Sequence, residues 1–152
     1  MKNPVIRLLL VDDHFFVRMG LTGFLNAEPD IRVVAEADNG TQALKLYREH
    51  KPDLVILDGR LPGMSGVETL TALRGDFPNA RVLMFSIDKG EEDVYRAMQA
   101  GAAGYLSKAT QLSELLCAIR TIYAGKNYLP PALAACLAER GSGAALTERE
   151  AL

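Results

Sequence analysis

Five polar residues at the ends of short apolar runs have the chemistry of a phosphoryl-transfer site. Asp12 and Asp13 end one run, Asp58 ends another, Ser86 ends a third, and Lys108 follows a fourth. Three crowded carboxylates are costly unless a cation binds them, and oxygen ligands suit Mg²⁺, whereas zinc sites favour His and Cys. An aspartate is an established nucleophile in phosphoryl transfer. Mg²⁺ and Lys108 would neutralise charge on the phosphoryl oxygens, and Ser86 would donate a hydrogen bond to one of them.

These residues come together only if the apolar runs are neighbouring parallel strands. Five runs have the length of strands that are buried on both faces, at residues 5–11, 31–37, 54–58, 81–86 and 104–107. The second run alternates more than the others and is predicted nearer to an edge of the sheet. In open α/β sheets ligands bind beyond the carboxyl ends of the strands, and all five polar residues are predicted there.

Apolar residues at helical spacing lie between these runs and after the last one. The clearest stripe is Leu112, Leu115, Leu116, Ile119 and Ile122. Ser65 followed by Glu68 predicts a capping box at the third helix, and Phe15 and Phe16 are predicted to pack at the start of the first. Five strand–helix units in alternation predict an α/β fold, a doubly wound parallel sheet with helices on both faces.

Length and composition favour one globular domain with a short appendage. The chain has 152 residues, of which 49% are apolar and 24% charged. The formal net charge of −2 argues against nucleic-acid binding by these residues, because phosphate contacts need clustered Lys and Arg. Cys117 and Cys136 are a poor disulfide framework and are interpreted as free thiols of a reducing cytosol. No stretch approaches the length of a membrane span.

The sequence changes character after Gly125. Residues 127–145 are predicted to be a linker that contains a short helix, roughly 132–139, after the Pro130-Pro131 pair. Residues 146–152 then begin a new helix, with a capping box from Thr147 to Glu150. The expected organisation is therefore a domain at 1–126, a linker at 127–145 and the start of a further domain at 146–152.

The order of the polar residues resembles that of the receiver domain of two-component response regulators. That family has Asp-Asp after strand one, Asp after strand three, Ser or Thr after strand four and Lys after strand five, and the resemblance covers about residues 4–126. Residues 61–66, LPGMSG, resemble the family's loop after the phosphorylated Asp. Residues 100–108 end in GYLSK and are similar to the segment that leads to the Lys in the NarL/FixJ (LuxR-type) subfamily. The resemblance implies the flavodoxin-like (CheY-like) fold with strand order 2-1-3-4-5.

Roles at the metal and phosphoryl site also follow from this resemblance. It implies that Asp58 is the phosphoacceptor. It implies that Asp12 and Asp13 bind Mg²⁺, together with Asp58 and the backbone carbonyl of Arg60. The expected phosphodonor is a phosphohistidine on a sensor histidine kinase.

The resemblance further implies a conformational switch rather than a classical enzyme. Ser86 and Lys108 would contact the phosphoryl group, and Tyr105 matches a switch aromatic whose ring turns inward as Ser86 moves. Residues 146–152 resemble the opening of a helix-turn-helix effector domain, whose remainder is absent from this sequence. The expected picture is a cytoplasmic transcription regulator that dimerises on phosphorylation and contacts DNA only through the missing C-terminal domain.

Each residue taken alone also has an ordinary structural interpretation. Asp12 and Asp13 fit a solvated strand end, Ser86 fits a turn, and Tyr105 fits core packing. His14 lies beside the acids, and it is expected to face solvent or to stand behind the metal ligands rather than to bind the metal.

Two other classes of protein share part of this pattern. A Mg²⁺-dependent phosphatase of the haloacid-dehalogenase kind needs a second acid two residues after its nucleophile, and here that position holds Arg60, which cannot protonate a leaving group. A pseudo-receiver that is never phosphorylated typically lacks an acid or the Lys, and none is lost here. Two departures from the family remain. Gly59 stands in place of an aliphatic residue and is expected to open space beside the site and to loosen the loop, whereas Ile87 stands in place of a small residue and is expected to crowd the approach to the phosphoryl group.

Overall fold

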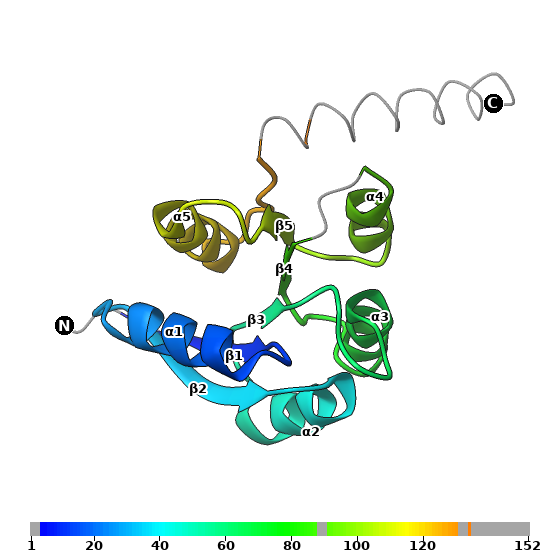
Figure 1. Ribbon diagram of the computed structural model, residues 1–152, viewed down its shortest axis with the longest axis horizontal. Helices are drawn as coiled ribbons and strands as arrows, with labels where there is room; N and C mark the ends of the chain where they lie inside the picture. The colour runs from blue at the N-terminus through cyan, green and yellow to red at the C-terminus, as the bar shows by residue number, and fades with distance from the viewer. Residues whose placement is uncertain (1–3, 88–90, 131–133, 135–152) are drawn as a thin grey trace, which may run out of the picture.

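A computed structural model describes residues 4–87, 91–130 and 134, and the account below concerns these residues. Strands and helices alternate from start to end (Figure 1). The strands are β1 (Ile6–Val11), β2 (Ile31–Ala37), β3 (Leu54–Leu57), β4 (Val82–Ser86) and β5 (Gly104–Ser107). The helices are α1 (Phe15–Asn26), α2 (Gly40–His50), α3 (Gly66–Asp76), α4 (Glu91–Gln99) and α5 (Leu112–Tyr123).

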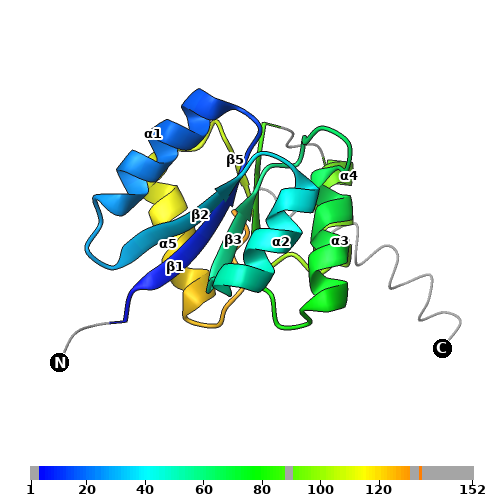
Figure 2. The same ribbon diagram turned by 90° about the horizontal axis from the view of Figure 1, so that it is seen from below.

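The five strands form one parallel sheet in the order β2-β1-β3-β4-β5. Helices α1 and α5 cover one face of the sheet, and α2, α3 and α4 cover the other (Figures 1 and 2). The predicted doubly wound fold and its strand order are confirmed. The prediction that the second strand lies near an edge is confirmed as well, because β2 pairs only with β1.

The sheet separates two apolar cores, and β1 contributes to both. Leu8 and Leu10 pack on the α1 and α5 side, whereas Leu9 and Val11 pack on the side of α2, α3 and α4. Strands covered on both faces have no position for a polar side chain, which explains why β1, β3 and β4 read as nearly continuous apolar runs. The edge strand β2 is less covered, and its interior residues are half-buried or exposed.

Some expectations for the helices need correction. Phe15 and Phe16 do begin α1, but their side chains are 60% and 78% exposed, so the predicted packing is wrong. The buried residues of α1 are Leu21 and Leu25, which lie on another face of the helix. In α5 the stripe residues Leu115, Ile119 and Ile122 are buried, as predicted. Leu116 is half-buried, and Leu112 in the first turn is 41% exposed.

Cys117 is an exposed free thiol, as the sequence predicts. The predictions for Cys136, for a linker helix near 132–139 and for the start of a further domain at 146–152 concern segments that lie outside the described residues, apart from the single position 134.

The start of α3 fixes the loop that follows β3. The predicted capping box is present: the Ser65 hydroxyl accepts a hydrogen bond from the Glu68 amide at 3.2 Å, and the Glu68 carboxylate accepts one from the Ser65 amide at 3.0 Å. The Gly66 amide donates to the Gly59 carbonyl at 3.1 Å. A Cβ at Gly66 would lie only 2.4 Å from the Asp58 carbonyl oxygen, so only glycine allows this approach.

We expect Gly66→Ala to lower the free energy of unfolding by about 2 kcal/mol, because the added methyl group meets backbone atoms that cannot rotate away. Gly75→Ala in the same helix is the matched control. Gly75 has no atom within 4 Å of the added Cβ, so its alanine variant should be as stable as the parent or more stable by up to about 1 kcal/mol. Urea unfolding of the three proteins measures both values, and equal effects at the two positions would contradict the steric explanation.

Candidate functional site

The carboxyl ends of four neighbouring strands hold the polar residues. Asp12 follows β1, Asp58 follows β3, Ser86 ends β4 and Lys108 follows β5. All but Lys108 are nearly inaccessible, with relative exposures of 2% for Asp12, 3% for Asp58 and 0% for Ser86. The Lys108 ammonium donates to Asp12 Oδ2 at 2.5 Å and to Asp58 Oδ2 at 3.2 Å. One cation therefore joins two buried carboxylates that are 46 residues apart in the chain.

The backbone holds each of these residues to the neighbouring strand. The Asp12 amide donates to the Ala37 carbonyl of β2 at 3.0 Å, and the Asp58 amide donates to the Val11 carbonyl of β1 at 2.9 Å. The Lys108 amide donates to the Ser86 carbonyl of β4 at 2.9 Å. The strand ladder thus continues one residue beyond each strand, so the charged side chains start from fixed backbone positions.

Asp12 is stabilised as a carboxylate. Burial would raise its pKa, but hydrogen bonds from Lys108 and from the His14 amide, together with the charge of Lys108, outweigh burial and hold the pKa of Asp12 below its ordinary value. The His14 amide lies 2.8 Å from Asp12 Oδ1, and Arg18 Nη1 donates to the Asp12 carbonyl at 2.5 Å. Asp12 therefore stays ionised at neutral pH.

The effect of burial on the pKa of Asp58 is offset less completely than it is at Asp12. Burial raises its pKa above the ordinary value, and the hydrogen bond from the Arg60 amide and the charge of Lys108 offset burial only in part, with Asp12 acting in the opposite direction. The Arg60 amide donates to Asp58 Oδ1 at 3.1 Å. Burial would lower the pKa of Lys108, but its bonds and charge interactions with Asp12 and Asp58 raise it, so Lys108 remains a cation. A further cation beside Asp58 would favour its ionised form.

Four side chains converge where such a cation would lie. Ligand atoms of Asp12, Asp13, His14 and Asp58 all lie within 4.8 Å of one another. The carboxylates fit a hard cation such as Mg²⁺, which takes oxygen ligands from one or two carboxylates and keeps several waters. Asp13 is 36% exposed at its side chain, which leaves room for those waters.

The side chain of His14 is exposed and also contacts the two acids that precede it. Its Nδ1 lies 3.1 Å from Asp12 Oδ1 and 3.2 Å from Asp13 Oδ1, while its side chain remains 63% exposed. The ring therefore faces solvent, as expected, and at the same time touches both carboxylates.

Gly59 and Ser86 are in close contact. A Cβ at position 59 would lie 2.8 Å from the Ser86 Oγ and 3.2 Å from the Ser86 Cβ. The expectation that Gly59 opens space beside the site is therefore wrong, because Ser86 fills that space. Ile87 follows directly, and its side chain is 60% exposed at the end of β4. Arg60 is exposed on the loop after Asp58.

Tyr105 lies on β5, opposite Met84 of β4, and is 2% exposed. Its ring is part of the core on the α4 side of the sheet, together with Val94 and Ala97. The structure therefore has the ring in the buried position, and a movement of the ring between two positions remains a prediction.

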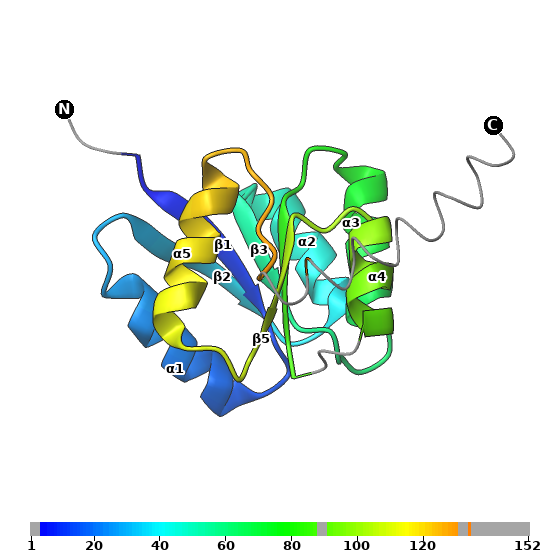
Figure 3. The ribbon, with the colours of Figure 1, turned by 90° about the horizontal axis from the view of Figure 1, so that it is seen from above.

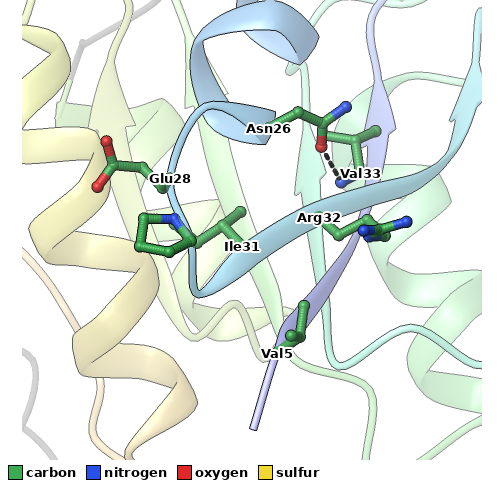
Figure 4. A pocket seen from close by; sticks show the side chains of 7 residues that line it. Val5, Asn26, Glu28, Ile31, Arg32 and Val33 are labelled. Carbon is green, nitrogen blue, oxygen red and sulfur yellow. Dashed lines mark hydrogen bonds between the residues drawn. The ribbon is translucent and has the colours of Figure 1, made fainter. Parts of the chain in front are cut away.

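A pocket away from these residues does not belong to the site. It lies near the amino-terminal ends of β1 and β2, whereas the polar cluster lies at their carboxyl ends (Figure 4). Its lining residues are Val5, Asn26, Glu28, Pro29, Ile31, Arg32 and Val33.

Among the described residues, no helix has the length and apolar composition that crossing a membrane requires.

Comparison with known proteins agrees with this geometry. Residues 8–120 match the family model of the response regulator receiver domain, and the chain therefore belongs to that family. Response regulator GacA of Pseudomonas aeruginosa is 41% identical over 134 residues, which are 88% of this chain and 63% of GacA. The nitrate/nitrite response regulator NarL of Escherichia coli is 42% identical over 144 residues, 94% of this chain and 67% of NarL. The chain thus spans about two thirds of the length of these relatives.

The solved structures place the chain in the NarL/FixJ type of receiver. A LuxR-family two-component response regulator from Aurantimonas sp. SI85-9A1 superposes with a TM-score of 0.85 at 38% identity, covering 91% of this chain and 99% of that one. The signal receiver domain of a NarL from Mycobacterium tuberculosis gives 0.78 at 36% identity, over 82% and 100% of the two chains. The subfamily that the GYLSK segment indicated is thereby confirmed.

We expect Lys108→Ala to lower the free energy of unfolding by about 3 kcal/mol at neutral pH, because it leaves Asp12 and Asp58 buried without their shared cation. Saturating Mg²⁺ should restore part of that loss, since a ligand that binds only the folded state stabilises it. Urea unfolding with and without Mg²⁺ measures both effects. Lys45→Ala, at an exposed position of α2, is the control and should change little. A Lys108 variant as stable as this control would show that the ion pairs do not hold the site.

Proposed function

We propose that this chain is a phosphorylation-dependent signalling switch that accepts a phosphoryl group on Asp58. The observation that carries the proposal is the pairing of buried Asp58 with Lys108, in contact with Asp12, at the carboxyl edge of the sheet. A nucleophile and a cation that balances developing charge are thereby held side by side on separate strands. Family membership supports the same assignment.

Mg²⁺ is the cofactor that these residues fit. Asp12, Asp13, Asp58 and the backbone carbonyl of Arg60 are the proposed ligands, supported by the convergence of the three carboxylates. When bound, the ion would supply positive charge to the phosphoryl oxygens. The raised pKa of Asp58 fits this role, because a buried carboxylate with too little compensation gains from a cation beside it.

The proposed donor is a phosphohistidine of a sensor histidine kinase. An Asp58 carboxylate oxygen forms a bond to phosphorus while the phosphorus–nitrogen bond breaks, and the imidazole nitrogen keeps the electron pair. The product on this chain is an aspartyl phosphate. Lys108 then pairs with a phosphoryl oxygen in place of the Asp58 oxygen that it contacts now, and Ser86 donates its hydroxyl hydrogen to another.

The output of the switch is proposed to pass through Ser86 and Tyr105 to a C-terminal DNA-binding effector. The relatives are named as response regulators, which supports a role in transcription regulation. Dimerisation on phosphorylation, DNA contact through the further domain alone and a location in the cytoplasm belong to this proposal. The self-catalysed gain and loss of one phosphoryl group makes the chain a switch and not a turnover enzyme.

Incubation with acetyl phosphate and Mg²⁺, followed by intact-mass measurement, tests the proposal. We expect a stable adduct of about 80 Da, one phosphoryl group. The Asp58→Asn variant should fold like the parent and form no adduct, because the amide has nearly the same shape but is not nucleophilic. An adduct that persists in this variant would move the acceptor to Asp12 or Asp13. Turnover of acetyl phosphate without an adduct would favour a phosphatase, and no reaction would favour a pseudo-receiver.

Ile87 is proposed to set the lifetime of the phosphoryl group. Its branched side chain is exposed and comes directly after Ser86, at a position where the family usually has a small residue. Hydrolysis needs a water in line with the oxygen–phosphorus bond, and bulk there obstructs it. Ile87→Ala should therefore gain and lose the phosphoryl group about tenfold faster, about 1.4 kcal/mol on each barrier. The time course of the adduct mass measures both rates, and a variant no faster than the parent would assign the lifetime to Arg60 instead.

A further inference from the structure

The segment after α5 returns to the sheet and pairs with β5. Tyr128 forms a parallel β-bridge with Gly104. The Tyr128 amide donates to the Ala103 carbonyl at 2.9 Å, and the Tyr105 amide donates to the Tyr128 carbonyl at 3.3 Å. The segment is visible next to β5, just beyond α5, in Figures 1 and 3. The amino-terminal end of β5 is thus paired at its outer edge with Tyr128.

This segment behaves like a short sixth strand, because its side chains alternate between the two faces of the sheet. Tyr128 packs against the core on the α5 side, and Leu129 packs against the core on the α4 side, which contains Tyr105. The Tyr128 hydroxyl also donates to the Glu114 carboxylate of α5 at 2.8 Å. Burial and this bond raise the pKa of Tyr128 to about 12.

Gly104 makes the pairing possible. A Cβ at this position would lie 2.5 Å from the Tyr128 carbonyl oxygen, closer than real side chains come. Gly104 also stands directly before Tyr105 in the segment that marks the subfamily. Because Gly104 has no side chain, residues 127–129 can approach the edge of β5 closely enough to pair with it.

Strand β5 connects this pairing to the phosphoryl site. Tyr105 bonds the segment through its amide and shares a core with Leu129 through its ring. Three residues further along, Lys108 holds Asp58. A phosphoryl group on Asp58 gives Lys108 a new partner, so the carboxyl end of β5 must adjust. The 3.3 Å bond from the Tyr105 amide is the longer of the two backbone bonds that join the segment to β5.

We propose that residues 127–129 are a latch on the edge of β5, closed in this structure and released when Asp58 is phosphorylated. The latch rests on the proposed function and adds the route by which the signal leaves the receiver. Release frees the backbone of residues 127–129 from the sheet and thereby changes how the residues that follow are held. Leu129 is the side chain of the latch that packs in the same core as Tyr105. Gly104 is the position whose missing side chain leaves room for the latch.

Hydrogen exchange of single amides, measured by NMR on the whole chain, tests the latch. Beryllofluoride with Mg²⁺ imitates the phosphoryl group without a kinase. We expect the Tyr128 amide to exchange at least about tenfold faster in the beryllofluoride state. The Ala103 amide, which bonds to the Val82 carbonyl at 2.8 Å on the other side of β5, is the internal control and should keep its protection. A shift of the Asp58 and Lys108 amides shows that the mimic is bound.

Two outcomes separate the latch from the function on which it rests. If Asp58 and Lys108 respond while the Tyr128 exchange rate stays the same, the site is functional and the latch is wrong. If neither Asp58 nor Lys108 responds, the proposed function and the latch are both wrong.

Variants test the latch without any phosphoryl mimic. Leu129→Ala should raise the Tyr128 exchange rate in the unmodified chain, whereas Leu112→Ala, at an exposed position of α5, should leave it unchanged. Gly104→Ala should raise it further, because its methyl group meets the Tyr128 carbonyl. Gly104 also faces Leu83 and Ile122 closely, so the Leu129 variant decides the result if Gly104→Ala does not fold. Equal Tyr128 exchange in the Leu129 and Leu112 variants would overturn the latch.

Discussion

The rest of the site depends on a cluster of buried charges in which carboxylates outnumber cations. Asp12 and Asp58 are buried side by side, and a single Lys108 ammonium stands between them. Two carboxylates against one cation leave a net negative charge in a place with little water, even before the more exposed Asp13 is added. Such an arrangement persists only where the backbone holds the groups in place, and it attracts positive charge. The affinity of this edge for a cation follows from the imbalance itself.

The strand ladder and two glycines supply the necessary rigidity. Each charged residue stands one position beyond a strand, where its amide is still bonded to the neighbouring strand. The loop after Asp58 is closed by Gly66, which touches the Asp58 carbonyl, and by Gly59, which touches Ser86. Side chains at either glycine would push the loop outward. The site is therefore built from close backbone contacts as much as from charged groups, and small changes at one strand end must be shared with its neighbours.

Much of this arrangement was predictable because it depends on periodicity and strand order. Five apolar runs predicted five parallel strands, and a polar residue at the end of each of four runs predicted convergence of the side chains. The contact of Gly59 with Ser86 and the docking of Tyr128 were not predicted. These contacts join residues far apart in the chain or depend on one side-chain conformation, and no local pattern records them.

The exposure of Phe15 and Phe16 shows that apolar character alone does not predict which side chains are buried. Apolar character predicted that they pack, but the face of α1 that meets the sheet is set by Leu21 and Leu25.

The position of β5 explains why this edge of the sheet, and not the other, can carry a signal outward. The two outer strands differ in their neighbours: β2 lies beside β1, which leads to Asp12, whereas β5 lies beside β4, which ends in Ser86. Only β5 also carries a charged group of the site, Lys108, and a large buried side chain, Tyr105. Movement at Lys108 therefore acts directly on an edge strand, whereas movement at Asp12 reaches β2 indirectly, through the backbone bond to Ala37 and through Arg18, which bonds both the Asp12 carbonyl and Glu36. An edge strand has one partner fewer than an interior strand, so it shifts at lower cost, and what pairs with its free side shifts with it.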